Sequence, residues 1–142
     1  MKRRVDVLIS NRLFWFATIA AAVVVFVAAT VFGLTQTTWF DEGYSVLLAQ
    51  RPVGELISLT ALDAHPPLYY LLLKGWIGVF GLSDLSLRAS SALFGALAIV
   101  ATALLLRKLF TTKVAIISLP FLTLAPFMLR YDYEIRMYAL EI

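Results

Sequence analysis

The chain has 142 residues, of which 61% are hydrophobic and 15% are charged; its formal net charge is +3 and its mean hydropathy is +0.88. Soluble domains are nearer half apolar, so the composition predicts an integral membrane protein, for which we expect an all-α fold. The absence of cysteine excludes disulfides and thiol chemistry. The dispersed basic residues favour topology signals over a nucleic-acid-binding surface.

The first predicted element is a membrane span at residues 13–34. These 22 residues carry no charge, and about 20 apolar residues cross a bilayer as a helix. The run is longer than the roughly 7–15 apolar residues of a cleaved signal peptide, so a retained span is favoured. A cytoplasmic N-terminus is predicted because positive residues stay on that side, and the cations before the span are Lys2, Arg3, Arg4 and Arg12.

Residues 35–86 form the longest region without a predicted span, and we expect an outer loop with interfacial helices there. An acid pair, Asp41-Glu42, follows the first span closely and is flanked by aromatic residues. The segment 68–82 is apolar but short, and Lys74 interrupts it. An interfacial or re-entrant helix is therefore favoured over a span for this segment.

Two further spans are predicted, at residues 87–106 and at about 114–131. A four-span topology, in which 68–82 also crosses the membrane, puts the same number of cations on the cytoplasmic side, so the count does not decide. The short 68–82 segment and the tight Arg107-Lys108 pair favour three spans. The chain stops in helix-compatible sequence, so we expect it to be the N-terminal part of a longer membrane protein.

With three spans, two polar segments meet on the outer side of the membrane. The first contains Asp41, Glu42 and His65, and the second runs from Arg130 to Tyr138. A carboxylate can take a proton from an acceptor hydroxyl, while Arg, Lys and His can hold a phosphate and stabilise its charge as it leaves. This combination favours transfer of a group from a lipid-linked phosphate.

Four motifs follow one another along the chain: WFDEGYS at 39–45, HPPLYY at 65–70, LRASSALFG at 87–95 and YEIRMYAL at 133–140. Together they resemble the N-terminal part of the GT-C glycosyltransferases, in the family-39-like branch that includes protein O-mannosyltransferases and lipid A aminoarabinose transferases. The resemblance covers residues from about 13 to 142. It implies the N-terminal transmembrane helices of a GT-C fold, with membrane-parallel helices in the first outer loop.

The resemblance also implies roles for individual residues. Asp41 matches the acid that follows the first span and would act as general base or orient the acceptor, with Glu42 as its catalytic neighbour. His65 matches a position that is basic in some relatives and approaches the lipid phosphate. The remaining substrate-binding candidates are Arg88, Asp132, Glu134, Arg136 and Tyr138. The Asp-x-Glu spacing is similar to that of metal-binding acids in oligosaccharyl-type relatives, but a divalent metal is not favoured and no cofactor is expected.

The implied function is that of an inverting glycosyltransferase. Its donor would be a polyprenyl-phosphate sugar, and its acceptor a hydroxyl of a protein, lipid or glycan at the outer face. We expect a multi-pass protein among the lipids of the plasma membrane, and we expect residues 1–142 alone to be inactive. The alternatives are a non-enzymatic membrane scaffold and part of a transporter whose acids line an ion path.

Each candidate residue also has a simpler interpretation. The acid pair could begin a helix or stay in a solvated loop, and His65 could be an interfacial side chain without a ligand. Arg88 could extend to lipid headgroups. Asp132 and Arg136 are four residues apart and could form a helical ion pair, and the tyrosines could be an aromatic belt.

Overall fold

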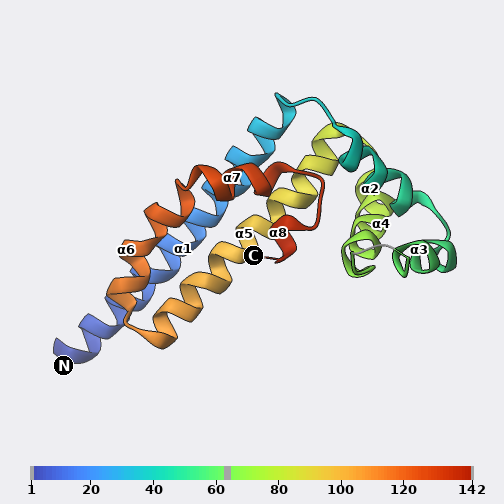
Figure 1. The fold of residues 1–142 in the computed structure, drawn as a ribbon. Helices are drawn as coiled ribbons and strands as arrows, with labels where there is room; N and C mark the ends of the chain where they lie inside the picture. The colour runs from blue at the N-terminus through green and yellow to red at the C-terminus, as the bar shows by residue number, and fades with distance from the viewer. Residues whose placement is uncertain (1, 63–64, 142) are drawn as a thin grey trace.

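The computed structural model describes residues 2–62 and 65–141, with side chains from 11 to 62 and from 65 to 140. Every regular element in these ranges is an α-helix, which confirms the predicted fold class. Figure 1 shows the helices, which are α1 (Lys2–Leu34), α2 (Phe40–Gln50), α3 (Val53–Thr60), α4 (Leu68–Phe80), α5 (Asp84–Leu109), α6 (Thr112–Thr123), α7 (Pro126–Tyr133) and α8 (Tyr138–Glu141).

The helices α1, α5 and α6 form an elongated bundle (Figure 1). Its core contains Phe14 of α1, Ile99 and Ala103 of α5 and Leu119 of α6. Small residues at such contacts let helix backbones approach closely, as helix pairs in membranes require. Asn11–Leu34 and Asp84–Leu109 are each long and apolar enough to cross a membrane, in agreement with an integral membrane protein.

The first two bundle helices run in opposite directions. A Cβ added at Gly33, near the end of α1, would lie 2.7 Å from Cδ of Arg88, near the start of α5. At the other end of the bundle, the Arg107 guanidinium lies 4.5 Å from the ring centre of Phe14. The segment 35–83 therefore leaves and rejoins the bundle at the same end.

The segment predicted as a span at 114–131 is not one straight helix. It forms α6 and the first part of α7, which are bent by 67° relative to each other. Pro126 begins α7, and Ala125 before it has φ −68° and ψ 113°, because a proline ring disfavours helical geometry in the preceding residue. The bend lays α7 across α1 and α5 (Figure 1).

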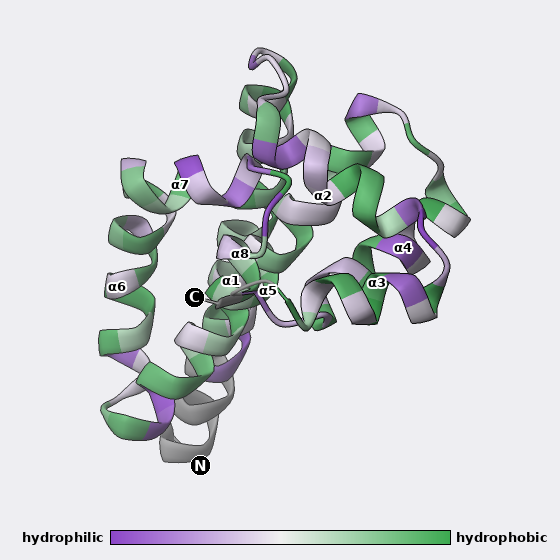
Figure 2. Ribbon diagram, turned by 45° about the vertical axis from the view of Figure 1, so that its right-hand side comes forward, coloured by the Kyte–Doolittle hydropathy of each residue, from purple (hydrophilic) through white to green (hydrophobic). Residues whose placement is uncertain are grey.

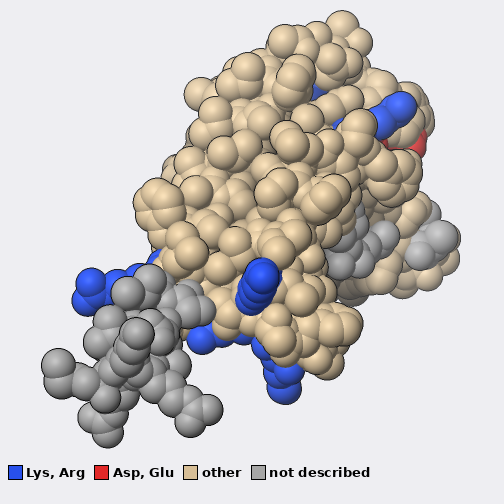
Figure 3. All heavy atoms as spheres, turned by 90° about the vertical axis from the view of Figure 1, so that its left-hand side faces the viewer, with Lys and Arg blue, Asp and Glu red and all other residues tan. Residues whose placement is uncertain are grey.

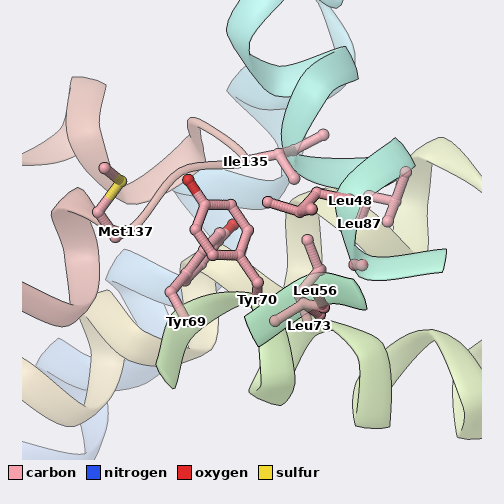
Figure 4. Packing of buried hydrophobic residues seen from close by; sticks show 9 residues of the cluster. Leu48, Leu56, Tyr69, Tyr70, Leu73, Leu87, Ile135 and Met137 are labelled. Carbon is pink, nitrogen blue, oxygen red and sulfur yellow. The ribbon is translucent and has the colours of Figure 1, made fainter. Parts of the chain in front are cut away.

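The helices α2, α3 and α4 lie beside the bundle as a separate layer (Figure 1). They pack on the start of α5 and on the segment 135–137 through a second apolar cluster. Figure 4 labels eight of its residues, which are Leu48, Leu56, Tyr69, Tyr70, Leu73, Leu87, Ile135 and Met137. This cluster fixes α2, whose first turn carries the acid pair, against the end of the chain.

The helix α4 contains the charge that interrupts the apolar segment 68–82. Its 13 residues are about 20 Å long, which is shorter than the hydrocarbon core of about 30 Å. Lys74 Nζ donates hydrogen bonds to the carbonyls of Ala49, over 3.3 Å, and Arg51, over 2.9 Å, at the end of α2. A cation is favourable at a helix C-terminus, so Lys74 stabilises the packing of α4 on α2.

Polar residues divide between the two ends of the bundle. Figure 2 shows that the bundle helices are mainly hydrophobic. Hydrophilic residues lie near α7, in the layer formed by α2, α3 and α4, and towards the N-terminus. On the face drawn in Figure 3, Lys and Arg side chains gather at the end where α1 begins. The end of α5, with Arg107 and Lys108, and the start of α6, with Lys113, lie at that end because Arg107 packs on Phe14.

Candidate functional site

A buried ion pair joins the start of α2 to the start of α5. Glu42 is 1% exposed and Arg88 is fully buried. Arg88 Nη1 donates a hydrogen bond to Glu42 Oε1, and Arg88 Nη2 donates to Glu42 Oε2 over 3.2 Å. A bidentate pair of this kind fixes both the position and the orientation of its partners.

Backbone groups form further hydrogen bonds with the Glu42–Arg88 pair. The N–H of Ile135 donates to Glu42 Oε1 over 2.9 Å, and the N–H of Trp39 donates to Glu42 Oε2 over 3.3 Å. Arg88 Nη1 also donates to the carbonyl of Tyr133 over 3.0 Å. A carboxylate offers about four lone-pair sites, so the two oxygens of Glu42 have no capacity left for a substrate.

Asp41, the residue before Glu42, faces a separate pocket of about 550 Å³, which we name the Asp41 pocket. Its lining residues are Phe40, Asp41, Tyr44, Leu59, Leu62, His65 and Arg136. The Asp41 side chain is 39% exposed. Of the two adjacent acids, Asp41 is therefore the one that a ligand can reach.

Arg136 is a cation that lies beside Asp41. Its guanidinium Nη2 lies 3.9 Å from Asp41 Oδ2, and its side chain is 6% exposed. Nη1 donates to Ser45 Oγ over 3.3 Å and to the Asp41 carbonyl over 3.5 Å. Burial lowers the pKa of Arg136, but the hydrogen-bonded Tyr138 and nearby groups that include Asp41 outweigh burial, so the pKa lies above its ordinary value and the group stays charged.

A second pocket of about 310 Å³, which we name the Glu134 pocket, is lined in part by the ion pair itself. Its lining residues are Gln36, Thr37, Trp39, Glu42, Arg88, Arg130, Tyr131, Tyr133, Glu134 and Tyr138. Arg130 Nε lies 3.6 Å from Glu134 Oε1. Burial raises the pKa of Glu134 above its usual range, and the charge of Arg130 partly offsets this rise.

The structure divides the predicted site residues among three places. The Asp41 pocket contains Asp41, His65 and Arg136. The Glu134 pocket contains Glu42, Arg88, Glu134 and Tyr138. Asp132 lines neither pocket: it is buried against α5, where a Cβ added at Gly95 would overlap its carboxylate.

The simpler interpretations have different outcomes. The acid pair does begin a helix, because α2 starts at Phe40. Arg88 does not extend to headgroups, since it is fully buried. The helical ion pair between Asp132 and Arg136 is wrong, because α7 ends at Tyr133 and Arg136 contacts Asp41 instead.

Sequence reasoning missed two residues that shape the site. Ser45 accepts a hydrogen bond from Arg136, and Gly95 leaves the space that Asp132 fills. Ser45 lies one helical turn after Asp41, so a helix beginning before Asp41 would have put both on one face. Gly95 gave no such signal, because small residues are common wherever membrane helices touch.

Metal ligands do not cluster in the part of the chain that the structure describes. No group of three or more His, Cys, Asp or Glu residues there is close enough to hold a metal ion. The Asp-x-Glu pair of the second acidic segment is also split, since Glu134 lines a pocket and Asp132 packs on α5.

Residues 64–138 match the family described as dolichyl-phosphate-mannose-protein mannosyltransferase, and the match covers more than half of the chain. The chain belongs to this mannosyltransferase family. Membership confirms the predicted glycosyltransferase resemblance and points to glycosyl transfer from a polyprenyl-phosphate sugar. No curated protein and no solved structure matches the chain.

The match of this mannosyltransferase-family chain begins after Asp41 and Glu42. It includes all six residues predicted to bind substrate, which are His65, Arg88, Asp132, Glu134, Arg136 and Tyr138. The distinction between Asp41 and Glu42 therefore rests on geometry alone. Of the classes considered from sequence, the family supports the glycosyltransferase over the scaffold and the transporter.

Proposed function

We propose that the protein transfers a sugar from a polyprenyl-phosphate donor to an acceptor hydroxyl, with inversion, and that the reaction takes place in the Asp41 pocket. One observation carries the proposal. The accessible carboxylate of Asp41 shares this pocket with His65 and with the cationic Arg136, whose Nη2 lies 3.9 Å away. A base beside phosphate-binding cations is what transfer from a phosphate leaving group needs.

The proposed step exchanges one bond at the anomeric carbon and transfers one proton. The acceptor oxygen bonds to the anomeric carbon while the Asp41 carboxylate takes the hydroxyl proton. The bond between the anomeric carbon and the phosphate oxygen breaks, its electron pair stays with the phosphate, and polyprenyl phosphate leaves. Arg136 and His65 bind that phosphate and stabilise the charge that develops on it.

Apolar residues of the same pocket support a lipid-linked donor. Phe40 is 85% exposed and Leu62 is 90% exposed, and both line the pocket beside Asp41. A hydrocarbon tail can leave the pocket over these side chains and enter the bilayer. We place this end of the bundle at the outer face of the plasma membrane and the cationic end in the cytoplasm, as the positive-inside rule favours.

The remaining candidates have supporting roles in this proposal. Glu42 and Arg88 position Asp41, because the lone pairs of Glu42 are already occupied. Asp132 packs α7 on α5 and does not touch the substrate. The acceptor offers a hydroxyl of a protein, lipid or glycan. The inactivity of residues 1–142 alone stays a prediction, which sugar transfer by that segment would contradict.

The test is the Asp41→Asn variant of the full-length protein. Membranes that contain it are incubated with labelled polyprenyl-phosphate sugars, and transfer of the label to acceptor is followed. We expect a rate about 10²–10⁴-fold below that of the unchanged protein, which is the usual contribution of a general base. Asparagine keeps the size of the side chain and removes the ability to accept the proton.

Glu55→Gln is the matched control, because Glu55 is an outer acid that lies in neither pocket and pairs with Arg51 at the surface. Its rate should equal that of the unchanged protein. Near-normal turnover by Asp41→Asn would remove Asp41 from the proposed mechanism.

A further inference from the structure

The Glu134 pocket has no role in the proposed transfer step. It shares no lining residue with the Asp41 pocket, although Asp41 and Glu42 are adjacent and each lines one of the two. The two pockets are therefore separate, and adjacent residues of the first turn of α2 line them. A ligand in the Glu134 pocket can sit close to the reaction without displacing Arg136 or His65.

The charges of the Glu134 pocket cancel. It contains two acids and two arginines, and each arginine is paired with an acid of the same pocket: Arg88 with Glu42, and Arg130 with Glu134 at 3.6 Å. A phosphate would gain no net attraction there, and neither would an ammonium group. The pocket therefore suits an uncharged ligand, in contrast to the Asp41 pocket with its buried cation.

Hydrogen-bond donors and acceptors both line the Glu134 pocket. The carboxylate of Glu134 is an acceptor and the guanidinium of Arg130, which is 70% exposed, is a donor. The exposed side chains of Gln36 and Thr37 add an amide and a hydroxyl. Adjacent donors and acceptors of this kind suit vicinal hydroxyl groups, each of which both donates and accepts.

Aromatic rings form the rest of the wall. Tyr131 packs edge-on against Tyr138, with ring centres 5.0 Å apart, and against Phe127, with ring centres 4.7 Å apart. Trp39 lies in the same lining and is 46% exposed. Such rings offer flat apolar surfaces for the C–H face of a sugar ring. The volume of about 310 Å³ is at the low end of the range of about 300–1,000 Å³ for small-molecule sites, which suits a single ring.

We propose that the Glu134 pocket binds an uncharged pyranose unit carried by the acceptor. The acceptor is then a molecule that is already glycosylated, held by this sugar while its hydroxyl reaches Asp41. Only the link to the acceptor rests on the proposed function, because binding of a neutral sugar requires no donor and no turnover.

The experiment follows the fluorescence of the full-length protein during titration with methyl α-D-mannopyranoside, in a detergent without a sugar headgroup. We expect a saturable change with a Kd in the millimolar range, typical of a single weakly held ring. Trp39→Phe should remove the part of the signal that comes from the pocket, since Trp15 and Trp76 lie outside it. Inorganic phosphate should neither produce the change nor compete with it.

Two variants test the contacts. Glu134→Gln should weaken sugar binding about tenfold, and Gln36→Ala, which keeps the backbone carbonyl that faces Arg88, should weaken it severalfold. Glu55→Gln should bind like the unchanged protein. The absence of saturable sugar binding, or binding of phosphate in its place, would overturn the inference.

The same variants separate this inference from the transfer mechanism. Asp41→Asn should lose transfer and keep sugar binding, whereas Glu134→Gln should raise the KM for a glycosylated acceptor and leave kcat within a few-fold. If Glu134→Gln lowers kcat and leaves that KM unchanged, the pocket does not bind the acceptor.

Discussion

Asp41 and Glu42 are neighbours in the chain with opposite surroundings. Successive residues of a helix point about 100° apart, so Glu42 enters the core and binds Arg88 while Asp41 faces a pocket. A buried charge whose partner is removed is strongly destabilising. The two acids should therefore respond differently to the same substitution.

Glu42→Gln should lower the free energy of unfolding by about 3–5 kcal/mol, because it leaves Arg88 buried without its counter-charge. The measurement is the unfolding midpoint of the full-length protein in one detergent. The control Glu55→Gln breaks only the surface pair with Arg51; the Glu55 side chain is 44% exposed and the Arg51 side chain is 58% exposed. This change should cost about 0–1 kcal/mol of stability. Equal losses in the two variants would refute a structural role for Glu42.

The sequence pattern selected residues most of which line the two pockets, but it did not separate their surroundings. The motif identified the acid pair, and the order of the motifs indicated Arg88 and Arg136. Which acid is buried depends on Arg88, 46 positions after Glu42, and on the Ile135 amide, 93 positions after it. Local periodicity carries no information about partners at such separations.

At the level of elements, the approach of α7 to α5 depends on one missing side chain. Gly95 lets the Asp132 carboxylate pack directly on the α5 backbone. Gly95→Ala should force the two helices apart and cost about 1–3 kcal/mol, the usual effect of overpacking. Because the displaced segment continues to Arg136, transfer should fall as well.

Gly78→Ala is the control for Gly95→Ala. A Cβ added at Gly78, within α4, meets nothing within 4 Å, so this change should stabilise the protein by about 0.5–1 kcal/mol through helix propensity. Unfolding midpoints of the two variants should move in opposite directions. A Gly95→Ala protein as stable as Gly78→Ala would show that α7 can shift freely.

The individual helices could be predicted from the sequence to different degrees. The predicted spans 13–34 and 87–106 lie within the long apolar helices Asn11–Leu34 and Asp84–Leu109. The predicted span 114–131 missed the bend, because Pro126 acts on the residue before it and hydropathy does not register backbone geometry. The prediction that 68–82 does not span the membrane stays a prediction, and the contact of Lys74 with the carbonyls at the end of α2 is a tertiary contact that the sequence does not show.

For the whole molecule, the antiparallel packing of α1 and α5 brings both acidic segments to one end and the basic turn to the other. Residues 1–142 contain no cysteine, so single-cysteine variants of this segment are made after any cysteine elsewhere in the full-length protein is replaced. With the N-terminus in the cytoplasm, Glu55→Cys should react with a membrane-impermeant thiol reagent in intact cells. Lys113→Cys should react only after the membrane is permeabilised.

The same protein without the introduced cysteine gives the baseline of this labelling experiment. Reaction of Glu55→Cys and Lys113→Cys from the same side would contradict the arrangement of α1, α5 and α6 in the membrane. Reaction of Lys113→Cys alone in intact cells would keep the arrangement and reverse the proposed orientation.

The partners of Glu42 and Asp41 lie far apart in the sequence, so they are synthesised at different times. A nascent chain inserted as far as α5 already holds both members of the Glu42–Arg88 pair, but the Ile135 amide and Arg136 emerge from the ribosome later. Until α7 and the segment after it fold over the earlier helices, Asp41 has no Arg136 beside it. If the two residues act as we propose, a growing chain cannot carry out the transfer before that segment has folded.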